Sequence, residues 1–165
     1  MITHPFTYQA PATIEEAVQQ LGKSGDAKVI AGGHSLLPLM KLRLAQPEKL
    51  IDIGRLAELR GVRKIAGGRL AIGALTTYDA LMRDPNIVHG LLRDALPGIG
   101  DVQVRNRGTI GGGIAHADPA SDMPAVLLAL DAEIVARSSK GERTIPIANF
   151  FKGSFTTALA ADEIL

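Results

Sequence analysis

Two glycine-rich segments, far apart in the sequence, most constrain what this chain can fold into. The first reads Ala31-Gly32-Gly33-His34-Ser35 and the second Thr109-Ile110-Gly111-Gly112-Gly113. Consecutive residues without a Cβ atom let the backbone turn sharply, and they let several N–H groups converge on one anion without a side-chain clash. Either segment alone is more typical of an ordinary tight turn. Together they suggest a pair of anion-binding turns suited to a diphosphate.

The composition is that of a folded protein without thiol chemistry of its own. Of the 165 residues, 46% are hydrophobic, enough for one domain or two small lobes. The 18 Lys and Arg nearly balance the 17 Asp and Glu, so the net charge of +1 is too small to attract nucleic acid or an anionic membrane. The chain has no cysteine and therefore cannot hold an iron–sulfur cluster through thiolates. Redox chemistry here would need an organic cofactor.

The N-terminal sequence lacks the basic start and apolar run of a secretory signal, and no stretch is apolar enough to span a bilayer. With only four Phe and two Tyr, the chain also offers few platforms for stacking nucleic-acid bases. We therefore expect a cytoplasmic protein that neither inserts into membranes nor binds nucleic acid.

Residues 1–54 alternate between helix and strand patterns. Thr13 and Glu16 have the spacing of a capping box, and the apolar residues that follow share one helical face as far as Leu21. We predict further elements in this order: a strand over 28–31, a helix over 36–42 and a strand over 50–53. The pattern predicts that residues 1–54 form an α/β lobe.

Residues 55–165 are predicted to form a second lobe. Gly67 and Gly68 suit a two-residue hairpin turn. Thr76 and Asp79 suit the start of one helix, and Ser121 or Asp122 can cap the start of another. The predicted elements are a hairpin of 62–65 with 70–72, a helix from 76, a helix over 86–96, a strand over 102–104, a turn over 108–113, a helix over 123–130 and a strand over 132–136.

The glycine segments and their neighbours resemble a known family. Residues 29–36, with 39–41 and Pro47 after them, resemble the first flavin loop of the medium subunits of molybdenum hydroxylases, and residues 105–113 with 116–122 resemble the second. The resemblance runs from Phe6 to the end of the chain. It is closest to the carbon monoxide dehydrogenase branch of a family that also includes xanthine dehydrogenase.

The resemblance implies an α+β fold, the two-lobed FAD-binding domain of the p-cresol methylhydroxylase and vanillyl-alcohol oxidase type. In that family both loops hold the FAD diphosphate, and an aspartate matching Asp122 contacts the cofactor. The cofactor-binding residues that it implies are Val29, Ile30, Ala31, Gly32, Gly33, His34, Ser35, Leu36, Thr109, Ile110, Gly111, Gly112, Gly113 and Asp122.

The resemblance also implies a role in electron transfer. In the family a molybdopterin-binding large subunit oxidises the substrate, an iron–sulfur small subunit passes electrons on, and FAD in the medium subunit delivers them to a final acceptor. We expect no catalytic side chain and no metal ligand in this chain. Family members continue past the position of Leu165, so we expect the chain alone to retain little flavin and to self-associate or need a partner.

Several other interpretations remain open. His116, Asp118 and Asp122 are metal-ligand types, but their spacing matches no common site. Arg105 and Arg107 either balance the cofactor phosphates or are simply solvated. A stand-alone flavin oxidoreductase of the same fold is the main functional alternative, and a truncated, non-catalytic fragment that binds a partner subunit is another.

Overall fold

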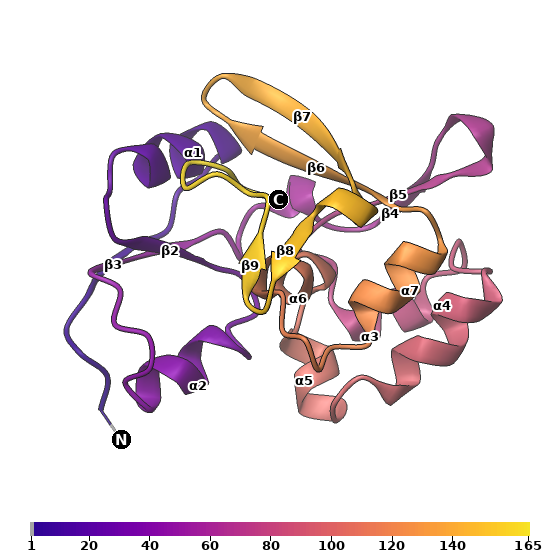
Figure 1. The fold of residues 1–165 in the computed structure, drawn as a ribbon, viewed down its shortest axis with the longest axis horizontal. Coiled ribbons are helices and arrows are strands. Elements are labelled where there is room, and N and C mark those ends of the chain that lie inside the picture. The colour runs from indigo at the N-terminus through magenta and orange to yellow at the C-terminus, as the bar shows by residue number, and fades with distance from the viewer. Residues whose placement is uncertain (1) are drawn as a thin grey trace.

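A three-stranded parallel sheet lies at the centre of the N-terminal part of the chain (Figure 1). The computed structural model describes residues 2–165. In the sheet, β3 lies between β1 and β2, so all three strands end at the same edge. The elements of this part are β1 (Thr7–Gln9), α1 (Ile14–Gly22), β2 (Ala27–Ile30), α2 (Leu36–Lys41) and β3 (Lys49–Asp52).

Helix α1 begins where the sequence predicts. Thr13 Oγ1 accepts a hydrogen bond from the Glu16 N–H at 3.1 Å, and Glu16 Oε2 accepts one from the Ala12 N–H at 2.8 Å. The helix then buries Ile14, Ala17, Val18 and Leu21. The predicted elements from residue 13 to residue 53 are confirmed to within one or two residues at each end.

The remainder of the chain forms a second group of helices and three hairpins (Figure 1). The hairpins pair β4 with β5, β6 with β7 and β8 with β9. The elements are β4 (Val62–Lys64), β5 (Leu70–Ile72), α3 (Tyr78–Arg83), α4 (Gly90–Ala95), α5 (Val102–Arg107), α6 (Ile110–His116), α7 (Met123–Ala129), β6 (Glu133–Ser138), β7 (Gly141–Pro146), β8 (Phe151–Gly153) and β9 (Thr156–Thr157). Single 3-10 turns lie at Ala57–Leu59, Ala66–Gly68, Leu96–Gly98 and Ile147–Asn149.

Two hydrophobic clusters stabilise these two parts. The larger contains side chains of α3, α4, α6, α7, β6 and β7, with Phe150 fully buried among them. The smaller packs α1 against β3 and also includes Leu75 and Ile164 from much later in the sequence. The two clusters support our proposal of two lobes with a boundary near residue 54, although the smaller cluster also includes Leu56, Leu75 and Ile164, which lie beyond that boundary.

The structure corrects three of the expected helices and strands. Residues 102–104 begin helix α5 and do not form a strand, because Asp101 Oδ1 accepts the Val104 N–H at 2.7 Å and caps the helix. Thr77, and not Thr76, caps α3 through the Ala80 N–H. The helix expected over 86–96 is regular only from residue 90 to residue 95.

The β4–β5 turn differs slightly from its prediction. Gly67 and Gly68 do adopt positive φ values, 75° and 73°, as a tight turn requires. The Ile65 N–H donates to the Arg69 carbonyl at 2.9 Å, so Ala66 also belongs to the turn, which is one residue longer than predicted.

Within residues 2–165, no helix has the length and apolar character needed to cross a membrane.

Candidate cofactor site

The first glycine-rich segment leaves the carboxyl end of β2 and leads into α2. Gly33 has a φ of 77°, which residues with a side chain rarely adopt. The backbone N–H groups of residues 32–35 donate no hydrogen bond to other residues of the described chain. His34 Nδ1 lies 3.4 Å from the Gly32 carbonyl oxygen, a local backbone contact. This loop therefore offers several adjacent free donors, as an anion-binding turn does.

The second glycine-rich segment is not the turn expected from the sequence. Residues 110–113 form the start of helix α6, and Thr109 caps it by accepting the Gly112 N–H at 3.1 Å. The Ile110 and Gly111 N–H groups donate to the carbonyls of Thr76 and Ala74 at 3.0 and 2.9 Å. Because these donors are already paired, this segment does not form a second nest of free N–H groups.

Packing within the chain explains the glycines of α6. A Cβ atom on Gly111 would lie 2.5 Å from the Ala74 Cβ, and one on Gly113 would overlap the Tyr78 hydroxyl oxygen. Such contacts are too short for real Cβ atoms, so only glycine lets α6 lie this close to its neighbours.

The two segments lie against each other. A Cβ atom on Gly32 would overlap the backbone carbonyl of Arg107, and the Cβ of Ala31 is 3.9 Å from the position that a Cβ on Gly112 would take. Close packing at Gly32 therefore joins the edge of the parallel sheet to the second group of helices. The fold brings together two segments that the sequence singled out separately.

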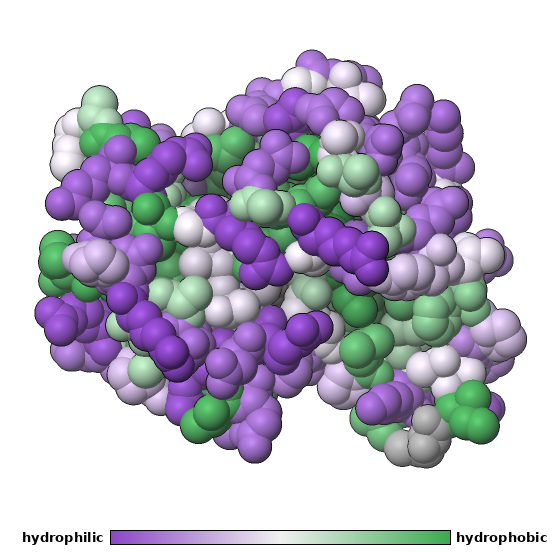
Figure 2. Space-filling model, turned by 180° about the vertical axis from the view of Figure 1, so that it is seen from behind, coloured by the Kyte–Doolittle hydropathy of each residue, from purple (hydrophilic) through white to green (hydrophobic). Residues whose placement is uncertain are grey.

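A pocket of about 320 Å³ opens at this junction, beside the carboxyl ends of the parallel strands. We call it the interlobe pocket. It is lined by Ala31, Gly32, Asp52, Gly54, Arg55, Arg60, Leu75, Thr77, Asn106, Arg107 and Thr109. Three arginines against one aspartate give it a positive lining. Viewed from behind, the middle of the molecule carries strongly hydrophilic side chains with paler, near-neutral residues between them (Figure 2).

Two threonines face each other at this pocket. Thr77 and Thr109 pair in an isolated antiparallel bridge, and both line the pocket. Each side-chain oxygen accepts an N–H at the start of a helix, that of α3 for Thr77 and that of α6 for Thr109. A hydroxyl that accepts in this way still has its own hydrogen to donate. The pair can therefore add neutral donors to the pocket.

Asp52 is the one carboxylate of the pocket lining, and its oxygens are engaged. Oδ2 accepts the Tyr8 hydroxyl at 2.5 Å, and Oδ1 accepts the Gly54 N–H at 2.7 Å. The hydrogen bond to Asp52 raises the pKa of Tyr8, because ionisation would place a second negative charge beside the carboxylate. Sequence reasoning missed Asp52, Arg55 and Arg60. Asp52 ends the parallel strand β3 and Arg55 follows it closely, at the edge where ligands of open α/β sheets bind, whereas Arg60 carries no such signal.

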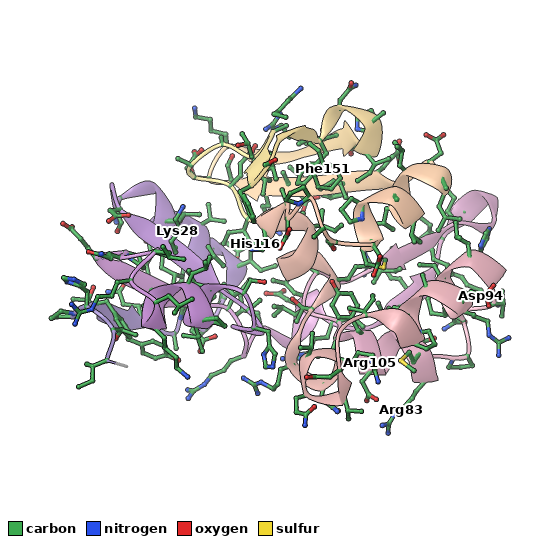
Figure 3. All side chains as sticks on the ribbon, turned by 60° about the horizontal axis from the view of Figure 1, so that its bottom comes forward. Lys28, Arg83, Asp94, Arg105, His116 and Phe151 are labelled. Atoms are coloured by element: carbon green, nitrogen blue, oxygen red, sulfur yellow. The ribbon has the colours of Figure 1, made fainter. Side chains whose placement is uncertain are left out.

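The structure separates the two arginines that precede α6. Arg105 Nη1 donates to the carbonyls of Ile99 and Gly100 at 3.0 and 3.2 Å, so its side chain holds the chain before α5 in place. Figure 3 shows Arg105 among the helices of the second lobe. Arg107 instead lines the interlobe pocket. Only Arg107 is therefore placed to meet a ligand there.

The remaining predicted site residues are more scattered. Val29 and Ile30 belong to β2, and Leu36 begins α2. Asp122 is exposed at the start of α7, and its side chain forms no capping hydrogen bond, contrary to expectation.

His116, one of the residues weighed as metal ligands, lies near the junction of the lobes (Figure 3). Its ring packs on that of Phe155, with centroids 5.2 Å apart. Asp118 Oδ1 accepts the Ala120 N–H at 2.9 Å, a local turn. No group of three or more His, Cys, Asp or Glu residues between positions 2 and 165 could hold a metal ion.

The fold and the pocket together define a two-lobed α+β domain with a polar site between its lobes. The chain belongs to the family described as the FAD binding domain in molybdopterin dehydrogenase, whose model matches residues 4–165. The expected family resemblance, fold class and cofactor, FAD, are therefore confirmed.

Two relatives are named as medium chains of dehydrogenases. The chain is 50% identical over 169 residues to the carbon monoxide dehydrogenase medium chain of Hydrogenophaga pseudoflava, covering 100% of this chain and 58% of the relative. It is 44% identical over 163 residues to the glyceraldehyde dehydrogenase medium chain of Sulfolobus acidocaldarius, covering 97% and 57%. The chain thus spans a little over half the length of these relatives.

Solved structures show the same fold. A chain of the carbon monoxide dehydrogenase from Hydrogenophaga pseudoflava that lacks the Mo-pyranopterin moiety of its cofactor superposes with a TM-score of 0.97 at 49% identity, covering 100% of this chain and 58% of that chain. A chain of quinoline 2-oxidoreductase from Pseudomonas putida 86 superposes with a TM-score of 0.96 at 38% identity, covering 99% of this chain and 58% of that chain.

Proposed function

We propose that the FAD diphosphate binds where the loop of residues 32–35 meets the start of α6, beside the interlobe pocket. The observation that carries this is the row of free N–H groups next to the positive φ of Gly33. A diphosphate needs several converging donors, and this loop supplies them without side-chain obstruction. The residues proposed to contact FAD remain Val29 to Leu36, Thr109 to Gly113 and Asp122.

The start of α6 contributes differently from the first loop in this proposal. Its N–H groups are already paired, so the hydroxyl of Thr109 and the open side of Gly112 are what it can present to the cofactor. A Cβ on Gly112 would meet only Thr109 Oγ1 at 2.8 Å and Ala31 Cβ at 3.9 Å. The space beside Gly112 is therefore the part of the second segment that suits a closely approaching ligand.

We further propose that the chain acts as the flavin part of a molybdenum-containing dehydrogenase in the cytoplasm. Several relatives are named as medium chains or medium subunits, including the nicotine 6-hydroxylase medium subunit of Paenarthrobacter nicotinovorans. The FAD would accept electrons from an iron–sulfur small subunit and pass them to a final acceptor, while a molybdopterin-binding large subunit oxidises the substrate. This chain's own residues bind and orient the flavin, and no side chain serves as acid or base.

A flavin titration tests the cofactor site. FAD and FMN are added separately to the purified chain, and binding is followed by flavin fluorescence and by the visible absorption spectrum. We expect FAD to bind far more tightly, since FMN lacks the second phosphate and the adenosine. Equal affinities for the two would contradict a diphosphate site between the lobes.

The relay role needs a second experiment. The chain is loaded with FAD and mixed with a reduced iron–sulfur subunit of a close relative, and bleaching of the flavin absorbance is recorded. We expect rapid reduction of the flavin when that subunit is present and slow reduction when it is omitted. Equal rates with and without the subunit would favour a stand-alone flavin oxidoreductase.

A further inference from the structure

The interlobe pocket carries more positive charge than its own residues neutralise. Arg60 is held in place, because its Nη2 donates to the Gly54 carbonyl at 2.7 Å and its Nη1 to the Leu75 carbonyl at 3.3 Å. The guanidinium groups of Arg55 and Arg107 form neither a hydrogen bond nor an ion pair with the described residues. Two unpaired cations therefore share one pocket with a third, fixed one.

These two arginines come from different segments of the chain. Arg55 follows β3, at the carboxyl end of the parallel sheet, and Arg107 ends α5, just before the cap of α6. Asp52 forms no ion pair with either one, and its single negative charge offsets at most one of the three arginine charges. Like charges that face one pocket repel each other, and a bound anion would remove this repulsion.

We propose that Arg55 and Arg107 form a phosphoryl-binding subsite that ties the loop after β3 to the end of α5. A guanidinium presents a planar fork of N–H donors that matches the oxygens of a phosphate. The hydroxyls of Thr77 and Thr109, which line the same pocket, can add neutral donors. This inference rests on the proposed function, since the phosphoryl group of FAD is the expected occupant, with free phosphate or pyrophosphate as the other source of the same chemistry.

The test compares Arg55→Gln, Arg107→Gln and the double variant with Arg63→Gln. Arg63 is an exposed residue of β4 that does not line the pocket, so its variant removes the same charge elsewhere. Affinities for FAD and for riboflavin, which has no phosphate, are measured by flavin fluorescence. Losing a charge-assisted hydrogen bond should weaken FAD binding about tenfold in each single variant. Riboflavin binding and the Arg63→Gln variant should be unaffected.

A second readout does not depend on flavin. A ligand that binds only the folded state raises the melting temperature. We expect pyrophosphate to raise the melting temperature of the parent chain more than sodium chloride of equal ionic strength does, with inorganic phosphate as a further arm. The double variant should lose this increment, and Arg63→Gln should keep it.

The outcomes separate the two proposals. If all variants bind FAD as the parent does, the subsite is overturned and the flavin function stands. If pyrophosphate stabilises the parent through the two arginines while FAD does not bind, the subsite stands and the flavin function fails. Equal weakening of riboflavin and FAD binding would show that the arginines act only through the fold, and this would overturn the subsite. A parent chain that responds to neither FAD nor pyrophosphate would also overturn it.

Discussion

A Cβ atom on residue 113 would overlap the hydroxyl oxygen of Tyr78. Tyr78 is only 5% exposed, and its burial raises the pKa of its hydroxyl to about 12. The side chain therefore has no room to move away, and the two residues fix how closely α6 approaches α3. This contact is by itself sufficient to require glycine at residue 113.

Gly113→Ala should destabilise the protein by about 1–3 kcal/mol through overpacking. The sign of this change in the free energy of unfolding is informative, because replacing glycine by alanine inside a helix otherwise stabilises a protein by about 1 kcal/mol. Adding Tyr78→Phe removes the overlapping oxygen and leaves the ring carbon 3.6 Å from the new Cβ, an ordinary contact. Urea unfolding of the two single variants and the double variant should show recovery. Additive losses would mean that the clash is not with Tyr78.

Gly33→Val should abolish FAD binding while leaving the fold intact. The φ of 77° at Gly33 is strongly unfavourable for a β-branched residue, and a Cβ there would lie 2.9 Å from Leu37 Cδ1. Gly33→Asn is the matched control, because asparagine tolerates this conformation better than other residues do. Circular dichroism checks folding, and a flavin titration measures affinity. A folded valine variant that binds FAD with the parent's affinity would show that the loop is a structural turn with no part in FAD binding.

Asp122→Ala should leave the free energy of unfolding nearly unchanged. The Asp122 side chain is exposed and does not cap α7, so the cost of about 1 kcal/mol that accompanies the loss of a capping residue should not appear. If Asp122 contacts FAD as we propose, the affinity for FAD should still fall. Thermal melting and flavin titration of the same preparation separate the two effects, and a destabilised variant with normal FAD affinity would assign Asp122 a structural role.

Acid should weaken the link between β7 and the segment around Glu163. Arg143 donates from Nε and Nη2 to the two carboxylate oxygens of Glu163 at 2.6 and 2.7 Å, and this hydrogen bonding holds the pKa of Glu163 below its ordinary value of 4.5. A lowered pKa contributes stability that is present above the ordinary value and is lost as the pH falls through the lowered one.

The free energy of unfolding of the parent should therefore exceed that of Glu163→Gln by about 1 kcal/mol at pH 7. This difference should shrink as the pH falls below 4.5. Urea unfolding at several pH values measures this difference. The Glu163 side chain is only 7% exposed, so salt should screen the pair less than a surface pair. If the difference in free energy of unfolding between the parent and Glu163→Gln grows on acidification, this would contradict a lowered pKa for Glu163.

Local patterns predicted the first lobe well because each element there carries its own signal. The cap of α1 at Thr13 and the apolar face that follows it need no distant contact to be recognised. The error at 102–104 arose where two β-branched valines favour a strand, while the Asp101 cap favours a helix. The cap and the packing of α5 decide the outcome.

The glycine segments show what a sequence pattern cannot separate. At residues 111–113 glycine has low helix propensity and indicates a turn, but contacts with Ala74 and Tyr78 require glycine within a helix. The fold does bring the two segments together, but the turn that the pattern predicted at residues 110–113 is the start of a helix. Arg55 and Arg60 belong to no motif, and only the folded chain brings them beside Arg107.

The place of Ile164 bears on how the chain folds during synthesis. Ile164 packs into the cluster formed by α1 and β3, and Arg137 exchanges backbone hydrogen bonds with it at 2.8 and 2.9 Å. Domains emerge from the ribosome from the N-terminus onward and often fold as they appear. Here the first lobe reaches the tunnel exit long before the isoleucine that completes its core. A nascent chain stalled before residue 164 should therefore leave α1 open to proteases and chaperones, and releasing it a few residues later should protect the helix.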